Sequence, residues 1–432
     1  MKICSKKDIK VVTGVMAASL LFSGCAITKQ KDKPLKNDPS IKTEINLNKI
    51  SDTKYDDDEM DELYRNYCFD LFSQTIKDYG GDGNVMISPT SIMMALDMVA
   101  AGTKGESLEQ LTELFAAGKG PLEQQAYASA LMDKINSSKD VKFSCANAVW
   151  ADGDYFGNTI NAEYVDYIKD TFLAEYKVTV FNDKTPDEIN SWIYDHTDHM
   201  IKKVLSQLDP ETVMVLVNAI SFDAKWEDKY EENQITEGKF TKADGDTQKV
   251  TYLNDTTKKY FETEKATGFM KNYKGGEYAF LAILPTDESI SANEFAKNFT
   301  AEDYEKFISS VTTAYDVHSK MPEFKYDYET TVNDTLKNLG CSDIFDKSKA
   351  NLSGIAGNPG DLYVSKVIHK THIEVDRKGT KAAAVTVVTI DAKCAVEDFV
   401  ETKVVNCDRP FVYAIVDTKT MAPVFIGTVN EV

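Results

Sequence analysis

One segment near the C-terminus has the sequence of a strand but is followed by the sequence of a loop. Residues 379–393 read GTKAAAVTVVTIDAK, with three consecutive alanines and then a β-branched run that lacks proline and glycine. In an extended chain alternate side chains share one face, and the even-numbered positions from Thr380 to Ile390 are all small or apolar. β-Branched residues favour strands. Because the residues that follow, to Asp398, are largely polar, this segment is either an ordinary strand or a strand-competent loop.

Length and composition describe a large globular protein. A chain of 432 residues has room for one large domain or for two to three smaller ones, each with a core. Its 42% hydrophobic and 10% aromatic content excludes wholesale disorder. The formal net charge of -20 argues against nucleic acid as a partner, because phosphate binding needs a basic surface.

The first 25 residues have the pattern of an export signal. Several lysines precede an apolar run over 11–22 that is too short to span a membrane stably. The run ends in Phe22-Ser23-Gly24-Cys25, which resembles the bacterial lipobox, although Phe22 stands where leucine is usual. The resemblance implies cleavage before Cys25 and lipidation of its thiol, which would anchor an exported protein at the cell surface. A plain secretory peptide or a membrane anchor is the alternative. We expect residues 1–25 to lie outside the fold.

The next segment differs from the rest of the chain in composition. Residues 26–57 are rich in Lys, Asp and Asn, contain two prolines and show no amphipathic period, which predicts a flexible tether before a domain over 58–432. Five cysteines fall in that domain, an odd number without metal-like spacing: Cys68, Cys145, Cys341, Cys394 and Cys407. A disulfide framework is not expected, and whether Cys394 is bridged to Cys407 stays open.

Hydrophobic periodicity predicts helices early in the domain and strands late. Helical spacing covers residues 59–79, 91–101, 107–116, 121–135, 161–173 and 186–197. Ser107 with Gln110 has the pattern of a capping box, and Thr185 that of an N-cap. Short apolar segments predict strands at 84–89, 212–221, 278–284, 411–416 and 423–429. This order indicates an α+β fold with one large sheet rather than an alternating α/β fold.

Several motifs, in the right order, resemble those of the serpin family. Asn84 to Ile92 resembles the signature N-x-x-x-S-P-x-S-I, and Val217 to Phe222 followed by Lys225-Trp226 resembles V-N-x-x-x-F-x-x-x-W. Further similar segments are 343–345, 350–354, 364–379, 409–411 and 425–427. The motifs extend over nearly all of the chain from residue 57 to Val432. The chain is identified as a member of the serpin family. This implies helices around a large central sheet, smaller sheets and an exposed reactive-centre loop at about 379–405.

The resemblance implies an irreversible suicide-substrate inhibitor of serine proteases. In serpins the protease cleaves the loop and forms an acyl-enzyme, and the loop then inserts into the central sheet as a new strand. A proline or charge on the buried face would stall insertion. The hinge lacks both on that face, because Lys381, which replaces the usual glutamate, would point outward; the hinge residues are Gly379, Thr380, Lys381, Ala382, Ala383 and Ala384. The alternative is a non-inhibitory serpin that acts as a surface binding module.

The family numbering of the loop places the scissile bond at Lys393–Cys394. Lysine at this position suits a trypsin-like protease with an acidic specificity pocket. The segment from Lys393 to Pro410 is longer than usual, however, so the bond could be displaced. A bond at Ala392, Cys394 or Val396 would instead suit an elastase-like protease.

Other residues resemble the family positions that control opening of the sheet. These are Trp226 at the opening and a buried polar cluster of Ser88, Ser91, Asn218 and His369. Arg377 stands where the family has glutamate, and Glu323 where it has the partner lysine. Since both signs are reversed, we predict an Arg377–Glu323 ion pair; two separately solvated charges are the alternative.

No motif indicates an enzyme or a cofactor. G-x-S-x-G, H-E-x-x-H, the Walker loop and G-x-G-x-x-G are all missing from the sequence. His196 and His199 lie three apart without an evident third ligand, so no metal site is expected. A solute-binding lipoprotein or surface enzyme therefore lacks a visible site. We expect a monomer without cofactors, whose partners are serine proteases and, through Cys25, a membrane.

Overall fold

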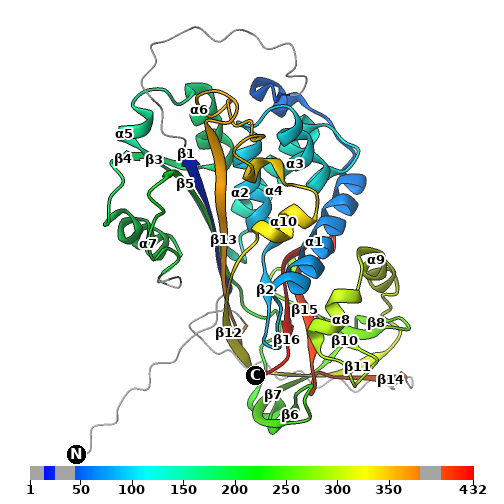
Figure 1. Ribbon diagram of the computed structural model, residues 1–432. Helices are drawn as coiled ribbons and strands as arrows, with labels where there is room; N and C mark the ends of the chain where they lie inside the picture. Colours follow the sequence, from blue (N-terminus) through cyan, green and yellow to red (C-terminus); the bar gives the residue numbers. More distant parts are fainter. Residues whose placement is uncertain (1–13, 25–43, 198, 200, 202, 380–399) are drawn as a thin grey trace, which may run out of the picture.

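The largest sheet of the molecule has six strands and runs through its centre (Figure 1). The structure, a computed structural model, describes residues 14–24, 44–197, 199, 201, 203–379 and 400–432. In spatial order the central strands are β12 (Phe324–Thr331), β13 (Leu362–Val375), β1 (Gly14–Gly24), β5 (Thr212–Asp223), β3 (Lys142–Asp152) and β4 (Glu175–Thr179).

In Figure 1 one smaller sheet lies beside the lower half of the central sheet and another lies below its lower end. One has the order β2 (Met86–Ile87), β16 (Pro423–Val429), β15 (Phe411–Asp417), β10 (Tyr278–Pro285), β9 (Ala266–Asn272) and β8 (Tyr260–Glu262). The other has the order β14 (Thr402–Asn406), β11 (Asp316–Pro322), β7 (Thr247–Thr257) and β6 (Ile235–Thr241).

Helices cover both faces of the central sheet (Figure 1). One face is covered by the early helices α1 (Asp57–Tyr79), α2 (Pro89–Ala100), α3 (Glu106–Ala116) and α4 (Pro121–Ser137), and the other by α7 (Thr185–His196). The remaining α-helices are α5 (Gly153–Phe156), α6 (Ala162–Phe172), α8 (Ala292–Asn298), α9 (Ala301–Ser309) and α10 (Asn333–Asn338). The 3₁₀ turns are η1 (Leu47–Asp52), η2 (Glu232–Gln234) and η3 (Asp343–Phe345).

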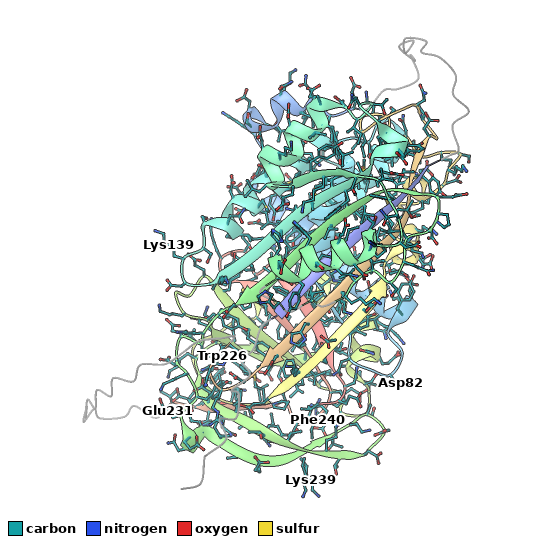
Figure 2. The ribbon with its side chains drawn as sticks, turned by 90° about the vertical axis from the view of Figure 1, so that its left-hand side faces the viewer. Asp82, Lys139, Trp226, Glu231, Lys239 and Phe240 are labelled. Carbon is teal, nitrogen blue, oxygen red and sulfur yellow. The ribbon has the colours of Figure 1, made fainter. Side chains whose placement is uncertain are left out.

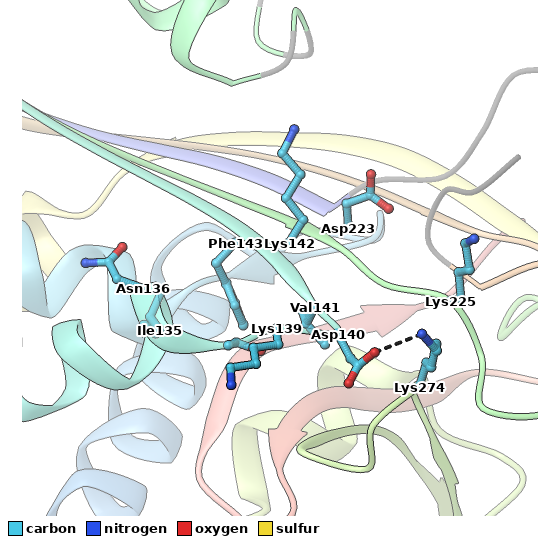
Figure 3. Close-up of a pocket in the computed structure, with 11 residues that line it drawn as sticks. Ile135, Asn136, Lys139, Asp140, Val141, Lys142, Phe143, Asp223, Lys225 and Lys274 are labelled. Carbon is cyan, nitrogen blue, oxygen red and sulfur yellow. Dashed lines mark ion pairs between the residues drawn. The ribbon is translucent and has the colours of Figure 1, made fainter.

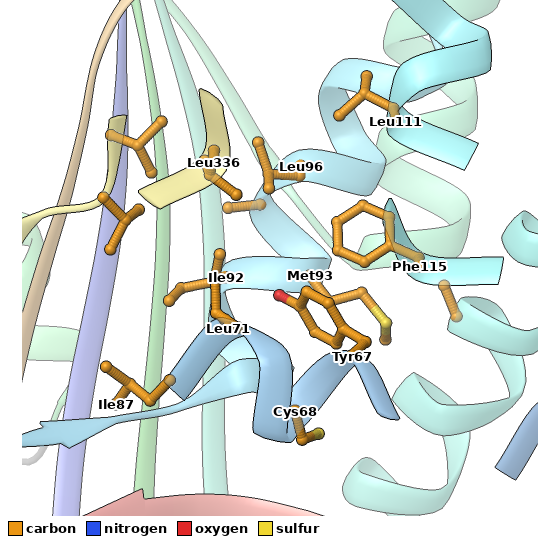
Figure 4. Close-up of a cluster of buried hydrophobic side chains, with 14 of the residues drawn as sticks. Tyr67, Cys68, Leu71, Ile87, Ile92, Met93, Leu96, Leu111, Phe115 and Leu336 are labelled. Atoms are coloured by element: carbon orange, nitrogen blue, oxygen red, sulfur yellow. The ribbon is translucent and has the colours of Figure 1, made fainter. Parts of the chain in front are cut away.

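Helix α2 is the centre of the core between the sheet and the outer helices. All twelve of its residues are buried. Its start is fixed locally, because Pro89 suits the first helical turn and the Ser88 side chain accepts a hydrogen bond from the Ser91 N–H. Figure 4 shows Ile92, Met93 and Leu96 of α2 among buried side chains of α1, α3 and α10. The core thus supports the central sheet from one side along its length.

The predicted α+β class and the six predicted helices are confirmed, with bounds within a few residues. Two predicted caps are wrong. Gly105, with φ of 60°, precedes α3 as its N-cap, and the Ser107 hydroxyl instead accepts a hydrogen bond from the Asn351 N–H. Lys184 is the N-cap of α7, and the Thr185 hydroxyl accepts a hydrogen bond from the Asn182 N–H. Both side chains hydrogen-bond to backbone outside their helix, which the capping pattern cannot indicate.

Two parts of the N-terminal region that were predicted to precede the domain contact it in this structure. Residues 14–24, expected outside the fold, form β1 at the centre of the large sheet. Residues 44–56, expected in the tether, pack on the domain: Ile50 of η1 is buried, and Ile45 and Leu47 contact the main core. The physical reason is the same in both places, since a few apolar side chains found complementary buried surface despite their polar neighbours.

Candidate functional site

Strand β1 occupies a position between β5 and β13 that we call the slot. It pairs antiparallel with both neighbours, from Val15 to Gly24 along β13 and from Gly14 to Ser23 along β5. Leu20 and Leu21 are 0% and 1% exposed, and they face opposite sides of the sheet: Leu20 joins the main core, and Leu21 packs with side chains of α7. Burying each leucine contributes about 2 kcal/mol. The slot therefore accepts an extended strand with apolar side chains on both faces.

The turn that follows β13 leads the chain directly into line with the slot. Gly379 forms bridges to Asp376 on one side and to Lys225 on the other. Both bridges are antiparallel, so each step forward from Gly379 corresponds to one step back along β13 and along the segment that leads back to β5. Counted in this way, the bridges have the same register as β1. Val15 pairs with His372 and Ser221, which is the register that Gly379 would reach four residues later. The bridges of Gly379 are therefore in register with the position that β1 fills.

Gly379 has a conformation and a contact that only glycine tolerates. Its φ is 104°, in the region that favours glycine. A Cβ atom at this position would lie 2.3 Å from the backbone nitrogen of Trp226 and 2.5 Å from the Cα of Lys225. The close approach joins the end of β13 to the segment after β5.

Replacing Gly379 by alanine is expected to lower stability by at least about 2 kcal/mol, through strain at positive φ and the clash with Trp226. Thermal unfolding would measure this. Gly245→Ala is the matched control, because Gly245 has φ of 87° with nothing within 4 Å of the added Cβ. Equal losses in the two variants would show that the close approach contributes nothing.

Trp226 lies at the lower end of the central sheet, beside this turn (Figure 2). Its ring stacks on Tyr273 at 4.6 Å between centroids, and its indole Nε1 donates to the backbone carbonyl of Asp376 at 2.8 Å. The ammonium of Lys271 lies 5.8 Å from the Trp226 ring and 4.3 Å from that of Tyr230. Lys271 is only 5% exposed and is paired with Asp255, so its charge is compensated. Trp226 thus fixes the turn after β13, as its predicted location at the sheet opening requires.

Arg377 contacts Glu323 through its backbone, and not through its side chain as the predicted ion pair requires. The guanidinium of Arg377 contacts the carboxylate of Glu232 at 2.9 Å, while the Arg377 backbone N–H donates to Glu323 Oε1 at 3.2 Å. Burial raises the pKa of Glu323. The physical reason is that a carboxylate beside a turn can accept from the backbone, which leaves the long arginine side chain to an exposed partner. Glu232 is 88% exposed, so that ion pair contributes little.

The predicted polar cluster is assembled beneath the slot. Ser91 Oγ donates to Asn218 Oδ1 at 2.5 Å, and the Ser88 N–H donates to His369 Nε2 at 3.0 Å. Asn218 on β5 and His369 on β13 are separated by β1, because Ala18 of β1 pairs with both of them. The two halves of the cluster thus sit on the two walls of the slot.

One member of this network was missed by sequence reasoning. Asn147 on β3 accepts from Asn218 Nδ2 at 2.6 Å and donates to the carbonyl of Phe172 at 2.6 Å. It is 2% exposed. A buried asparagine in a strand is a usable signal, since it needs hydrogen-bond partners that only neighbouring elements supply.

His369 is fully buried, and burial lowers its pKa to about 3. Its Nδ1 has no hydrogen-bond partner among the described residues. Between pH 6.5 and about 3 the unfolded chain therefore binds a proton that the folded protein excludes. Stability is present above pH 6.5 and falls as the pH falls toward 3.

His369→Gln is expected to remove this acid sensitivity, because glutamine does not titrate and its Oε1 can still accept from Ser88. The difference in unfolding free energy between wild type and variant should change by about 1.4 kcal/mol per pH unit below pH 6.5. Denaturant unfolding at a series of pH values measures it. His318→Gln, at an exposed histidine of β11, is the control. An unchanged acid slope in His369→Gln would contradict the prediction.

A surface pocket of about 420 Å³ lies beside the same end of the sheet (Figure 3). The start of β3 and the segment after β5 line the pocket, and its lining residues include Lys139, Lys225 and Lys274. Lys274 is paired with Asp140 at 2.9 Å. The pocket is open, and both lysines and aspartates line it.

The remaining predicted sites fall outside the described residues or have other contacts. Outside them lie Cys25, the reactive bond Lys393–Cys394 and the hinge residues Thr380, Lys381, Ala382, Ala383 and Ala384. Cys68, Cys341 and Cys407 are buried free thiols, so Cys407 is not bridged in this structure. His196 contacts Glu175 at 3.2 Å and His199 lies 3.8 Å from Asp195.

The described residues contain no group of three or more His, Cys, Asp or Glu arranged to hold a metal ion. Among them no helix combines the length and the apolar character that crossing a membrane requires.

A large central sheet with a strand position between β5 and β13 is typical of one protein family, and comparison with known proteins identifies that family. The family model described as "Serpin (serine protease inhibitor)" matches residues 62–432. The chain therefore belongs to the serpin family and has the serpin fold. A serpin-like protein of Methanosarcina mazei is 30% identical over 98% of this chain and 97% of its own length. Leukocyte elastase inhibitor A of Mus musculus is 31% identical over 84% of this chain and 97% of its own.

The thermophilic serpin tengpin, solved in its native state, is similar in structure. Its TM-score is 0.77, its sequence identity 35%, and the match covers 88% of this chain and 96% of that chain.

Proposed function

We propose that this serpin inhibits serine proteases irreversibly, by insertion of its cleaved reactive-centre loop into the slot. The observation that carries the proposal is that the slot accepts a strand antiparallel to both β5 and β13. A loop that leaves β13 and turns back must run in that direction. Insertion of the loop would drag the acylated protease away before the acyl bond is hydrolysed.

Continuing the register of the Gly379 bridges would give each loop residue a defined position in the slot. Counting on from these bridges, Ala384 would take the position of Met16, Thr386 that of Ala18 and Val388 that of Leu20. These even-numbered residues would point toward the core, and each is small or apolar. Thr386 would lie between His369 and Asn218, where a hydroxyl has polar neighbours.

The odd-numbered loop residues point to the opposite face, toward α7. Lys381 would lie between Asp223 of β5 and Glu374 of β13, counting from the same bridges. A lysine here is therefore placed beside two carboxylates, which offsets the reversal of the family's usual charge. None of the even-numbered residues from Thr380 to Ile390, which would face the core, is charged.

The sequence supports Lys393–Cys394 as the reactive bond, and hence a trypsin-like target. Leukocyte elastase inhibitor A is similar to this chain, so an elastase-like target with a bond at Ala392, Cys394 or Val396 is the second case to test. We further propose that the protein is exported, processed before Cys25, and held at the cell surface by lipid on that cysteine. The signal-like composition of residues 1–25 supports this step.

Incubation with trypsin and with an elastase tests the proposal. The form that begins at Lys29 should give a complex that resists denaturant, with a released peptide whose mass starts at Cys394. A peptide that starts elsewhere would keep the mechanism and move the bond. Clean cleavage without complex, for every protease tried, would contradict inhibition and leave a serpin that acts as a surface binding module.

A further inference from the structure

We infer that residues 14–24 block the inhibitor until they are removed, because as β1 they occupy the slot that the loop must enter. The inference rests on the proposed function, since it concerns the same slot. A chain that retains β1 has no vacant position between β5 and β13 (Figure 2). Cleavage of its loop therefore releases the protease instead of trapping it.

The contacts of β1 make it a strong competitor for the loop. Its ladders with β5 and β13 extend over at least ten residues on each side. Leu20 and Leu21 are 0% and 1% exposed, and by the register of Gly379 the loop would offer Val388 and Thr389 at these two positions. Leucine buries more apolar surface than valine or threonine, so side-chain packing at these positions favours β1 over the loop.

The end of β1 coincides with the predicted processing position. The strand ends at Gly24, and the lipobox-like sequence predicts cleavage between Gly24 and Cys25. A single cut there removes the whole strand and no residue of the remaining domain. Export processing would then remove β1 and leave the position between β5 and β13 available to the loop.

The experiment compares full-length, unprocessed protein with its Leu20→Asp variant. A carboxylate at a fully buried position should expel β1 from the sheet. Leu173→Asp is the matched control, since Leu173 is 61% exposed. The measurements are hydrogen exchange of residues 14–24, the thermal unfolding temperature, and the yield of denaturant-resistant complex with trypsin and elastase.

Full-length protein and Leu173→Asp should protect the amides of residues 14–24 from exchange. Both should unfold about 10 °C higher than Leu20→Asp and give at least about ten-fold less complex. Equal complex yields from full-length protein and Leu20→Asp, or unprotected amides in residues 14–24, would overturn the inference.

Failure of the proposed function would look different. If Leu20→Asp and the form that begins at Lys29 both give no complex, inhibition is disproved. In that case the hydrogen exchange of residues 14–24, and the difference in unfolding temperature between full-length protein and Leu20→Asp, would still decide whether β1 fills the slot.

Discussion

Ala384→Arg should convert the protein from an inhibitor of its target protease into a substrate. Continuing the register of Gly379, residue 384 would enter the slot between Ile220 and Thr371, which are both fully buried. A guanidinium there has no carboxylate beside it, and an unpaired buried charge costs several kcal/mol. Because about 1.4 kcal/mol changes a rate ten-fold, insertion would lose its competition with hydrolysis of the acyl-enzyme. The number of inhibitor molecules consumed per protease should rise at least about ten-fold.

Ala383→Arg provides the matched control for this prediction. The same substitution one residue earlier places the guanidinium on the opposite face, beside His372. Inhibition should be nearly unchanged. Both variants are titrated against the protease in the form that lacks β1, and the products are separated on a denaturing gel. Equal loss in the two variants would mean that the face assignment, and with it the register, is wrong.

Elements with a strong local pattern were predicted well from the sequence. Helix α2 and strand β5 are long, apolar and free of breakers, and their predicted ranges match the structure closely. The polar cluster could be located as well, because its serines and asparagine lie within recognisable motifs. Its hydrogen-bond partners could not, since they come from β3 and from the carbonyl of Phe172.

Strand β3 shows why other elements were missed. Its sequence places Asn147 on a buried position, which breaks the alternation expected of a strand, and the polar atoms are satisfied only by neighbours far away in sequence. Strand β1 shows the opposite case. A short apolar run without charges suits an export signal and a central strand equally, and only the slot between β5 and β13 distinguishes them. Such outcomes depend on non-local contacts that periodicity does not contain.

The largest stability effect away from the slot is expected at Asp97, a residue that sequence reasoning did not single out. Asp97 lies on α2 and is fully buried. Its Oδ1 accepts from Gln124 Nε2 at 2.5 Å and from Gln125 Nε2 at 3.2 Å, both on α4. Within the part of the chain that the structure describes, Asp97 Oδ2 and Gln124 Oε1 have no partner. A proton on the carboxyl group would give Asp97 a hydrogen-bond donor, which the carboxylate lacks.

Burial raises the pKa of Asp97 from 3.8 to about 8. Between these values the unfolded chain has released a proton that the folded protein still holds, so stability falls as the pH rises from about 4 to 8. This loss of stability is absent below about pH 4 and reaches its full size above about pH 8. Its size is of order 5 kcal/mol, from about 1.4 kcal/mol for each pH unit. The carboxyl group therefore penalises the fold most in alkaline solution.

Asp97→Asn should relieve this penalty, because the asparagine amide can donate to Gln124 Oε1 without any charge. At pH 8 the variant should unfold about 10 °C above wild type, and at pH 4 the two should agree within about 2 °C. Thermal unfolding of the full chain at both pH values makes the measurement, and Asp133→Asn, at an exposed aspartate on α4, is the control. A variant that is destabilised equally at both pH values would show that Asp97 acts through its shape and not its charge. A higher unfolding temperature of Asp97→Asn at pH 8 but not at pH 4 would show that ionisation of the buried carboxyl group destabilises the wild type.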